Sequence, residues 1–234
     1  MGVVTFAGGK VGMTGPVLWP ENFADATWSE IIEACHTNTV PDTWQPGDSK
    51  AMTINGKDYM IDIIGKNHDD YADGSGKAPL TFQMHDCYAD TKQINASSTT
   101  AGGWTDCAMR KTHLPAILAL MPSDVQAGIK EVNKLTTAGS QSATVNTTAD
   151  KLFLLSEIEI FGSVTYSGSG EGSQYAYYSA GNSKVKNVSS SAFSWWERSP
   201  HVRSSTYFCR VNTAGEPYNY GAVNSYGVAF AFCF

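Results

Sequence analysis

The sequence predicts an α+β fold with much irregular backbone. Three observations support this class: a short amphipathic helix near the start, a β-hairpin after it, and many short apolar segments between turn-rich stretches. A length of 234 residues with 42% hydrophobic and 16% charged residues is typical of a globular protein with one sizeable core. We therefore expect one compact domain over residues 25–234, preceded by a short strand or attachment arm over residues 1–24.

The helix is predicted over residues 28–36. It begins with a T-x-x-E capping box at Thr27 and Glu30, in which each side chain accepts a hydrogen bond from the other residue's backbone. Its apolar residues recur at helical spacing and form one stripe: Trp28, Ile31, Ile32 and Cys35. The stripe should pack on the core.

A hairpin is predicted next, because KAMTI and KDYMIDII flank Asn55-Gly56. This dipeptide readily supplies the two positive φ angles of a tight type I′ turn. A further strand is expected where apolar residues alternate with polar ones: Leu80, Phe82 and Met84 with Thr81, Gln83 and His85.

Two short helices are predicted after this strand, one from about Asp106 to Lys111 and one opened by a capping-box pattern at Ser123 and Gln126. Pro115 and Pro122 separate them. From residue 130 onward the pattern favours short strands in long loops: KEVNKLTT, KLFLLSEIEIFG, SWWERSP and two final strands, with a Gly/Ser/Tyr stretch at residues 167–182.

Composition argues against several classes of partner. The net charge of −6 and the pI near 5.3 come without a cluster of Lys and Arg, which predicts that the chain binds no nucleic acid. No apolar run approaches the roughly 20 residues that span a bilayer, and no signal peptide is evident, so we expect no membrane insertion. Five cysteines without a C-x-x-C pair are interpreted as reduced, buried, small apolar residues.

Motifs that carry catalysis are absent from the sequence, including G-x-S-x-G, the P-loop and H-E-x-x-H. We therefore predict no catalytic residue and no cofactor. The loop His68–Asp73 resembles a cation site, but we interpret its acidic residues as solvated turn residues rather than calcium ligands. His85, Cys87 and Cys107 are interpreted as packing residues rather than zinc ligands, and GSGEGS at residues 168–173 as a flexible surface loop.

The SWWERSP segment is interpreted as a structural anchor. One of Trp195 and Trp196 can enter the core, and Arg198 can pair with a local carboxylate.

The cations are sorted along the chain. All 12 lysines lie at or before Lys186, whereas three of the four arginines follow it: Arg198, Arg203 and Arg210. The segment from His201 to Tyr226 also lacks Lys, Gln, Met and Trp but is rich in Tyr, Asn and Ser. Binding surfaces favour this composition, because Tyr gives rigid amphipathic area and small polar residues give adaptable hydrogen bonds.

The segment WWERSPHVRSSTYFCRVNTAGEPYNYGAVNSYGVAFAFCF resembles the C-terminal variable region of diversity-generating retroelement variable proteins of gut bacteria and their phages. Upstream motifs such as IDIIGKNHDDYADGSGKAPLTFQMHDC extend the resemblance to roughly residues 27–234. The resemblance implies a C-type-lectin-like fold of the formylglycine-generating-enzyme type. It also implies a stable scaffold that displays variable residues, from about 198 to 234, to a protein or glycan ligand on a host-cell surface.

In such proteins diversification acts on adenines, chiefly in AAY codons, which can reach Arg and Tyr but not Lys, Glu, Gln, Met or Trp. Glu216 therefore departs from the pattern, and Gly221 and His201 fit it less well. The resemblance implies these ligand-binding residues: Ser204, Thr206, Tyr207, Arg210, Asn212, Ala214, Tyr218, Asn219, Tyr220, Asn224 and Tyr226. Period-two alternation predicts one shared face for Arg210, Asn212 and Ala214.

The sequence thus favours a non-enzymatic receptor-binding protein of a phage virion, in its tail, or of a bacterial cell surface. Three alternatives stay open: an oxidase of the formylglycine-generating type that uses Cys209 and Cys233, a calcium-dependent carbohydrate lectin, and a structural tail or fibre subunit.

Overall fold

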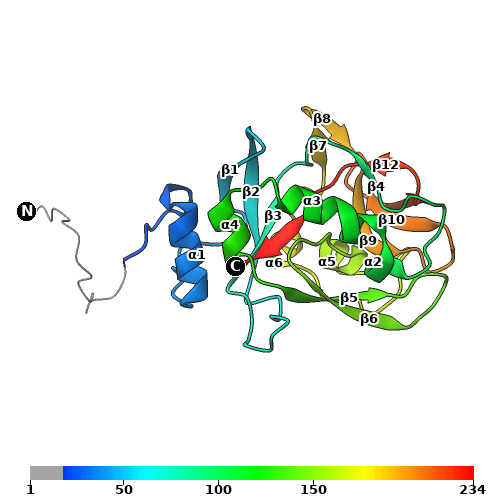
Figure 1. Cartoon of the computed structure of the whole chain (residues 1–234), viewed down its shortest axis with the longest axis horizontal. Helices are drawn as coiled ribbons and strands as arrows, with labels where there is room; N and C mark the ends of the chain where they lie inside the picture. The colour runs from blue at the N-terminus through cyan, green and yellow to red at the C-terminus, as the bar shows by residue number, and fades with distance from the viewer. Residues whose placement is uncertain (1–17) are drawn as a thin grey trace, which may run out of the picture.

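The computed structural model describes residues 18–234, which combine short helices with antiparallel strands (Figure 1). The four-stranded sheet has the order β1-β2-β3-β13: β1 Ser49–Ile54, β2 Lys57–Lys66, β3 Leu80–Met84 and β13 Ala231–Cys233. The three-stranded sheet has the order β11-β10-β9: β9 Trp195–Pro200, β10 Tyr207–Val211 and β11 Pro217–Gly221. Three strand pairs complete the set: β4 Lys92–Gln93 with β12 Ser225–Tyr226, β5 Val132–Thr137 with β6 Val145–Asp150, and β7 Lys186–Val188 with β8 Ser191–Phe193. The expected α+β class is confirmed.

The helices are short. The α-helices are α1 Trp28–His36, α2 Gly103–Asp106, α3 Leu114–Leu118, α4 Ser123–Gly128, α5 Glu157–Phe161 and α6 Ala176–Ser179. A 3-10 turn, η1 Phe23–Asp25, precedes them, and a π-helical segment, η2 Met109–His113, leads into α3. None of the helices between residues 18 and 234 has the length and apolar character needed to cross a membrane.

The two strongest local predictions are confirmed. Helix α1 begins at the capping box formed by Thr27 and Glu30. Strands β1 and β2 pair in register up to Ile54 and Lys57, and the turn residues Asn55 and Gly56 have φ angles of 49° and 75°. Both features depend on residues no more than a few positions apart.

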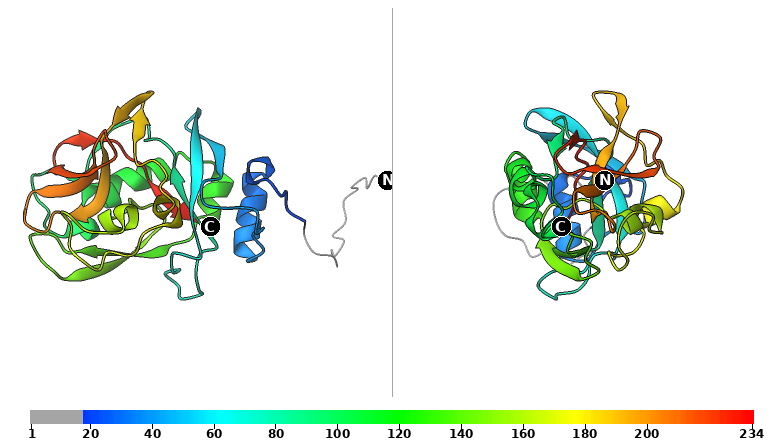
Figure 2. Two further views of the ribbon diagram at one scale, coloured as in Figure 1. Left: turned by 180° about the vertical axis from the view of Figure 1, so that it is seen from behind. Right: turned by 90° about the vertical axis from the view of Figure 1, so that its right-hand side faces the viewer.

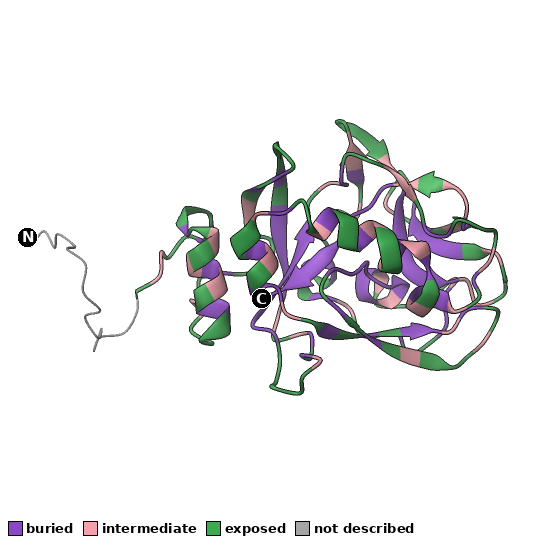
Figure 3. Cartoon of the chain, in the orientation of Figure 1, coloured by how far each residue is buried: buried purple, intermediate pink, exposed green. Residues whose placement is uncertain are grey.

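The predicted strand β3 forms, but its two faces are both buried. Its apolar side carries Phe82, which contacts Phe23, Phe232 and Phe234 at ring-centroid distances of 5.3–6.1 Å. Its polar side is covered as well: Thr81 donates to Asp69, and Gln83 accepts a hydrogen bond from the Tyr178 hydroxyl. Alternation in β3 therefore separates an apolar layer from a buried polar one, and Figure 3 shows this sheet buried along much of its length.

The predicted N-terminal arm falls mostly on residues 1–17, which lie outside the described residues. Phe23, which belongs to the predicted arm of residues 1–24 but is described, is buried against Trp44 at a ring-centroid distance of 5.5 Å. The folded body therefore includes Phe23.

The helix predicted from about Asp106 to Lys111 is wrong in its bounds. Helix α2 ends at Asp106, the backbone of Cys107 is extended, and helical structure resumes at Met109. Pro115 lies inside α3 rather than between helices, because a proline in the first turn of a helix removes no hydrogen bond that the helix needs.

Helix α4 forms as predicted, but its capping box does not. Ser123 is the first helical residue and Pro122 is the N-cap. The Gln126 amide instead donates to the carbonyl of Met121 at 2.7 Å.

The segment KLFLLSEIEIFG, predicted as a strand, forms no named strand and ends in helix α5. Only a single bridge joins Phe153 to Ala231, and α5 then begins at a full capping box of Ser156 and Glu159. The apolar run before Ser156 masked this helix start in the sequence.

The two main sheets lie toward opposite ends of the molecule (Figures 1 and 2). Helix α1 stands beside the four-stranded sheet toward one end, while the three-stranded sheet lies toward the other end in Figure 1 and in the left view of Figure 2. Strands β10 and β11, which carry most of the predicted ligand-binding residues, are thus presented away from α1, whereas β13 at the end of the same segment belongs to the sheet beside α1.

Candidate ligand-binding face

The three-stranded sheet presents the predicted site on one hairpin. Strands β10 and β11 pair antiparallel, with Arg210 opposite Tyr218 and Phe208 opposite Tyr220. In β11 the exposed Tyr218 and Tyr220 alternate with Asn219 and Gly221, as period-two geometry requires. In β10 every residue except Tyr207 is buried. The hairpin therefore offers its tyrosines to solvent from a buried support.

The predicted site residues differ in exposure. Four are exposed: Tyr207, Ala214, Tyr218 and Tyr220. Six are partly exposed: Ser204, Thr206, Asn212, Asn219, Asn224 and Tyr226. Arg210 alone is buried, with 9% of its surface exposed. Of the two less well fitting positions, His201 is partly exposed and Gly221 is buried.

The structure brings four of the predicted tyrosines together. The Tyr207 and Tyr220 rings stack with centroids 6.3 Å apart, and Tyr226 meets Tyr220 edge-on at 5.7 Å. Tyr218 lies on the same strand, two residues before Tyr220. We call Tyr207, Tyr218, Tyr220, Tyr226 and Arg210 the tyrosine face.

Arg210 lies under the rings of this face. Its guanidinium carbon is 4.4 Å from the Tyr226 ring centroid, 4.9 Å from that of Tyr218 and 5.4 Å from that of Tyr220. Its Nε is buried without a hydrogen-bond partner, and no carboxylate within residues 18–234 forms an ion pair with it. Cation–π attraction is thus the main interaction of this charge.

The predicted shared face of Arg210, Asn212 and Ala214 does not form. Strand β10 ends at Val211, and the chain then turns. Asn212 holds that turn: its Oδ1 accepts from the backbone N–H groups of Ala214 at 2.8 Å and Glu216 at 3.0 Å. Period-two alternation cannot continue beyond the end of a strand.

Two aromatic residues join the face from other segments, and the sequence analysis missed both. Tyr166 contacts Tyr218 at 6.4 Å, and Phe193 contacts Tyr226 at 6.3 Å. Tyr166 immediately precedes the Gly/Ser/Tyr stretch noted in the sequence. No local pattern links these residues to the hairpin, because tertiary contacts alone bring them there.

Strand β9 supports the face and is buried along its whole length. One of Trp195 and Trp196 is expected to enter the core; both are fully buried. Arg198 does not pair with its neighbour Glu197. Instead its Nη1 and Nη2 donate to Glu159 at 2.5 and 2.8 Å, and Lys134 joins Glu159 to Asp69 through contacts of 2.7 Å.

Glu197 is the exception in this interior. It is fully buried, and neither of its carboxyl oxygens has a hydrogen-bond partner. Burial, together with the nearby carboxyls of Glu157 and Glu171, raises its pKa well above the usual 4.5. Burial therefore favours the neutral form of this side chain in the folded protein.

The predicted cation loop is partly a buried ion pair. Asp69 is 4% exposed and accepts hydrogen bonds from Lys134 and from the Tyr175 hydroxyl, so its interpretation as a solvated turn residue is wrong. Burial alone would raise the pKa of Asp69, but the Lys134 ammonium and hydrogen bonds lower it to about 2. Asp70 and Asp73 are exposed or partly exposed. Within residues 18–234 no group of three or more His, Cys, Asp or Glu side chains is placed to hold a metal ion.

The GSGEGS segment is not a freely exposed loop. Glu171 at its centre is fully buried and accepts hydrogen bonds from the backbone and the hydroxyl of Thr137 at 2.8 and 2.7 Å. Its glycines permit close packing: a Cβ on Gly168 would lie 2.5 Å from the Thr137 side chain. This segment therefore anchors β5 to the interior beneath β9.

The five cysteines are free and buried, as predicted. Cys209 lies in β10 and Cys233 in β13, so the two belong to different sheets. Burial raises the pKa of both thiols well above the usual value of 9.0. A thiol with a raised pKa is a poor nucleophile at neutral pH.

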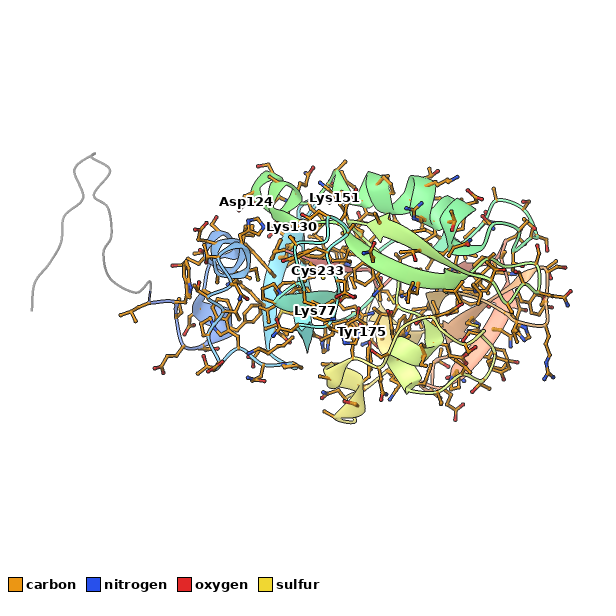
Figure 4. The ribbon with its side chains drawn as sticks, turned by 90° about the horizontal axis from the view of Figure 1, so that it is seen from below. Lys77, Asp124, Lys130, Lys151, Tyr175 and Cys233 are labelled. Carbon is orange, nitrogen blue, oxygen red and sulfur yellow. The ribbon has the colours of Figure 1, made fainter. Side chains whose placement is uncertain are left out.

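Hollows occur on other parts of the molecule. One of about 520 Å³ is lined by Tyr71, Lys77 and Lys130, near Cys233 (Figure 4). The face offers aromatic rings and hydroxyls at the surface, with one unpaired cation beneath them. This arrangement can contact a ligand but brings together no nucleophile and base.

Comparison with known proteins gives one match. A family model described as a domain of unknown function (DUF6273) matches residues 80–234, which is more than half of the chain. The matched segment runs from β3 to β13 and includes the whole tyrosine face. No curated protein and no solved structure matches the chain.

Proposed function

The chain belongs to the DUF6273 family, and we propose that it is a non-enzymatic ligand-binding protein that contacts its ligand through the tyrosine face. The observation that carries this proposal is the gathering of Tyr207, Tyr218 and Tyr220 on one hairpin, each 43–45% exposed, beside a strand of the same sheet that is buried throughout. Exposed tyrosines on a rigid support are typical of binding hot spots.

We extend the proposal to the origin of this surface. The chain acts as a retroelement variable protein with a C-type-lectin-like fold, located in a phage tail or on a bacterial surface. The α+β architecture with short elements supports this, as does the exposure of most residues that the resemblance implies to be diversified. Fold alone does not imply function, so the argument depends on the site.

The gene's surroundings test the origin. We expect a near-identical repeat of the segment encoding residues 198–234, with additional adenines at the codons of the proposed site residues, beside a reverse-transcriptase gene. A genome that lacks both the repeat and the reverse transcriptase would contradict the diversification proposal.

Selection from displayed libraries tests the binding function. One library randomises the exposed and partly exposed site residues of the full chain, and a matched library randomises as many exposed positions at the α1 end. Panned against the same immobilised proteins and glycans, the first library should give binders far more often. Equal yields from the two libraries, or none from the first, would contradict the proposal.

A further inference from the structure

Arg210 is a buried cation that the protein does not satisfy. It is 9% exposed, its Nε has no partner, and no ion pair or hydrogen bond joins its guanidinium to any residue from 18 to 234. A buried charge is costly unless it is paired and hydrogen-bonded. The rings of Tyr218, Tyr220 and Tyr226 offset part of this cost by cation–π attraction.

Those rings leave the hydrogen-bonding capacity of Arg210 unused. An aromatic ring attracts the charge of a guanidinium, but it is not a conventional acceptor for its five N–H donors. The planar fork of these donors matches a carboxylate, sulfate or phosphate, which accepts two parallel hydrogen bonds. An oxyanion would therefore complete the hydrogen bonding of Arg210.

The surroundings of Arg210 favour an oxyanion from outside the protein. The hydroxyls of Tyr207, Tyr218, Tyr220 and Tyr226 form no hydrogen bond with any described residue and can donate to the same group. The nearest carboxylate in the chain sequence, Glu216, accepts instead from Asn212 at 3.0 Å. The tyrosine face thus surrounds the cation with rings whose hydroxyls are free, and the one acidic residue of the hairpin bonds elsewhere.

We propose that the ligand of the tyrosine face carries an oxyanion, a carboxylate, sulfate or phosphate, which accepts paired hydrogen bonds from the Arg210 guanidinium between the rings of Tyr218, Tyr220 and Tyr226. This inference rests on the proposed binding function and adds the chemical class of the ligand. An aromatic-lined site with one central cation selects a group that is flat or compact, anionic and attached to a body that can stack on tyrosine.

The direct test is an NMR titration of the full chain labelled with ¹⁵N-arginine, whose Nε–Hε signals come from only four arginines. Arg210→Lys and Arg203→Met identify the signals of interest. Sodium acetate, sulfate and phosphate are added separately, with sodium chloride at equal ionic strength as the control. We expect a saturable shift of the Arg210 signal with at least one oxyanion, and the anion that saturates at the lowest concentration identifies the group.

Two outcomes would overturn the proposal. One is equal, non-saturating shifts of Arg210 and the exposed Arg203. The other is an Arg210 signal that no oxyanion moves beyond the effect of chloride, because the guanidinium would then serve packing alone. The titration itself uses the wild-type chain, so the variants serve only to identify the signals.

A panel of immobilised sulfated, phosphorylated, carboxylated and neutral glycans tests the same point with larger ligands. We expect binding to anionic members only, reduced at least tenfold by Arg210→Lys and abolished by Arg210→Met, with Arg203→Met unchanged. Capture of neutral glycans that survives Arg210→Met would overturn the oxyanion inference and leave the binding function standing. Failure of both this panel and the displayed libraries would instead contradict the binding function itself.

Discussion

Arg198 in β9 and Arg210 in β10 lie in neighbouring strands, and both are more than nine-tenths buried, yet their surroundings differ in kind. Arg198 donates to Glu159, to the hydroxyl of Thr136 and to backbone carbonyls that include that of Leu154 at 2.9 Å. Arg210 has three tyrosine rings and no acceptor among the described residues.

The difference separates the two functions of the sheet. Arg198 is a buried charge that holds the interior together, and the acceptors for its N–H groups come from residues that are 27 to 63 positions away in the sequence. Where the charge lies beneath the tyrosine face, the chain supplies aromatic contact and leaves the donors free. An interior must satisfy its own polar groups, whereas a binding surface can leave that to a ligand.

The largest effect is expected from a comparison of two displayed libraries that each vary five positions. One varies the exposed or partly exposed hairpin residues Tyr207, Ala214, Tyr218, Asn219 and Tyr220, and the other truncates the fully buried Trp195, Trp196, Phe208, Phe230 and Phe232. Truncating one buried aromatic costs about 3–5 kcal/mol, against a total stability of about 5–15 kcal/mol. Surface changes typically cost about 0.5 kcal/mol or less. We expect most clones of the first library and almost none of the second to resist protease; equal survival would mean that scaffold and face are not distinct.

A single pair of variants tests the two arginines directly. Arg198→Met leaves Glu159 buried with half of its charge partners, and breaking such a pair costs about 3–5 kcal/mol. Arg210→Met leaves no carboxylate unpaired and loses mainly cation–π attraction, about 1 kcal/mol. Urea unfolding should therefore show a much larger loss for Arg198→Met. A comparable loss in Arg210→Met would mean that Arg210 is a structural residue.

The local elements of the fold were predictable because a few neighbouring residues determine them. Thr27 with Glu30 fixes the start of α1, and Asn55-Gly56 fixes the β1–β2 turn. Helix α5 starts with the same kind of capping box at Ser156, yet a run of buried apolar residues before it resembles a strand. Competing local patterns of this kind need tertiary contacts to decide between them.

The candidate site was predictable in composition but not in arrangement. The excess of tyrosine between residues 201 and 226 indicated the segment. The burial of Arg210 could not be read from it, because Tyr226 reaches the guanidinium from β12, which pairs with the distant β4. The ion pairs of Lys134 with Asp69 and of Arg198 with Glu159 join residues 65 and 39 positions apart. Sequence spacing carries no information on such contacts.

Glu197 is an exception to this comparison, because it is an interior polar group whose carboxyl oxygens have no hydrogen-bond partner. Its raised pKa favours the neutral carboxyl in the folded protein, whereas in the unfolded chain the carboxyl ionises around its usual pKa of 4.5. The contribution of the neutral form to the free energy of unfolding is therefore fully present below pH 4.5. This contribution falls as pH rises toward the folded pKa, by up to about 1.4 kcal/mol per pH unit. Glu197→Gln removes this ionisation. We expect the variant's unfolding free energy to gain on that of wild type between pH 5 and 8, with the exposed Glu216→Gln as control; parallel pH curves would mean that Glu197 finds a partner in solution.

The smallest expected effect concerns Asn212, a proposed variable residue that also holds the turn after β10. Its Oδ1 accepts two backbone N–H groups, so Asn212→Ala removes both bonds. A typical hydrogen bond contributes about 0.5–1.5 kcal/mol, and because this turn is exposed to water the loss should lie near the lower figure.

Asn219→Ala is the matched control, since Asn219 forms no side-chain hydrogen bond with the described residues and should leave stability unchanged. At this chain length about 1 kcal/mol corresponds to a melting-temperature shift of roughly 2–4 °C, which calorimetry resolves. A loss in Asn212→Ala with none in Asn219→Ala would mark Asn212 as scaffold within the variable region. Equal values would show that the backbone bonds from Asn212 N–H to the Glu216 carbonyl and from Gly215 N–H to the Asn212 carbonyl hold the turn alone, which leaves Asn212 free to vary with the tyrosine face.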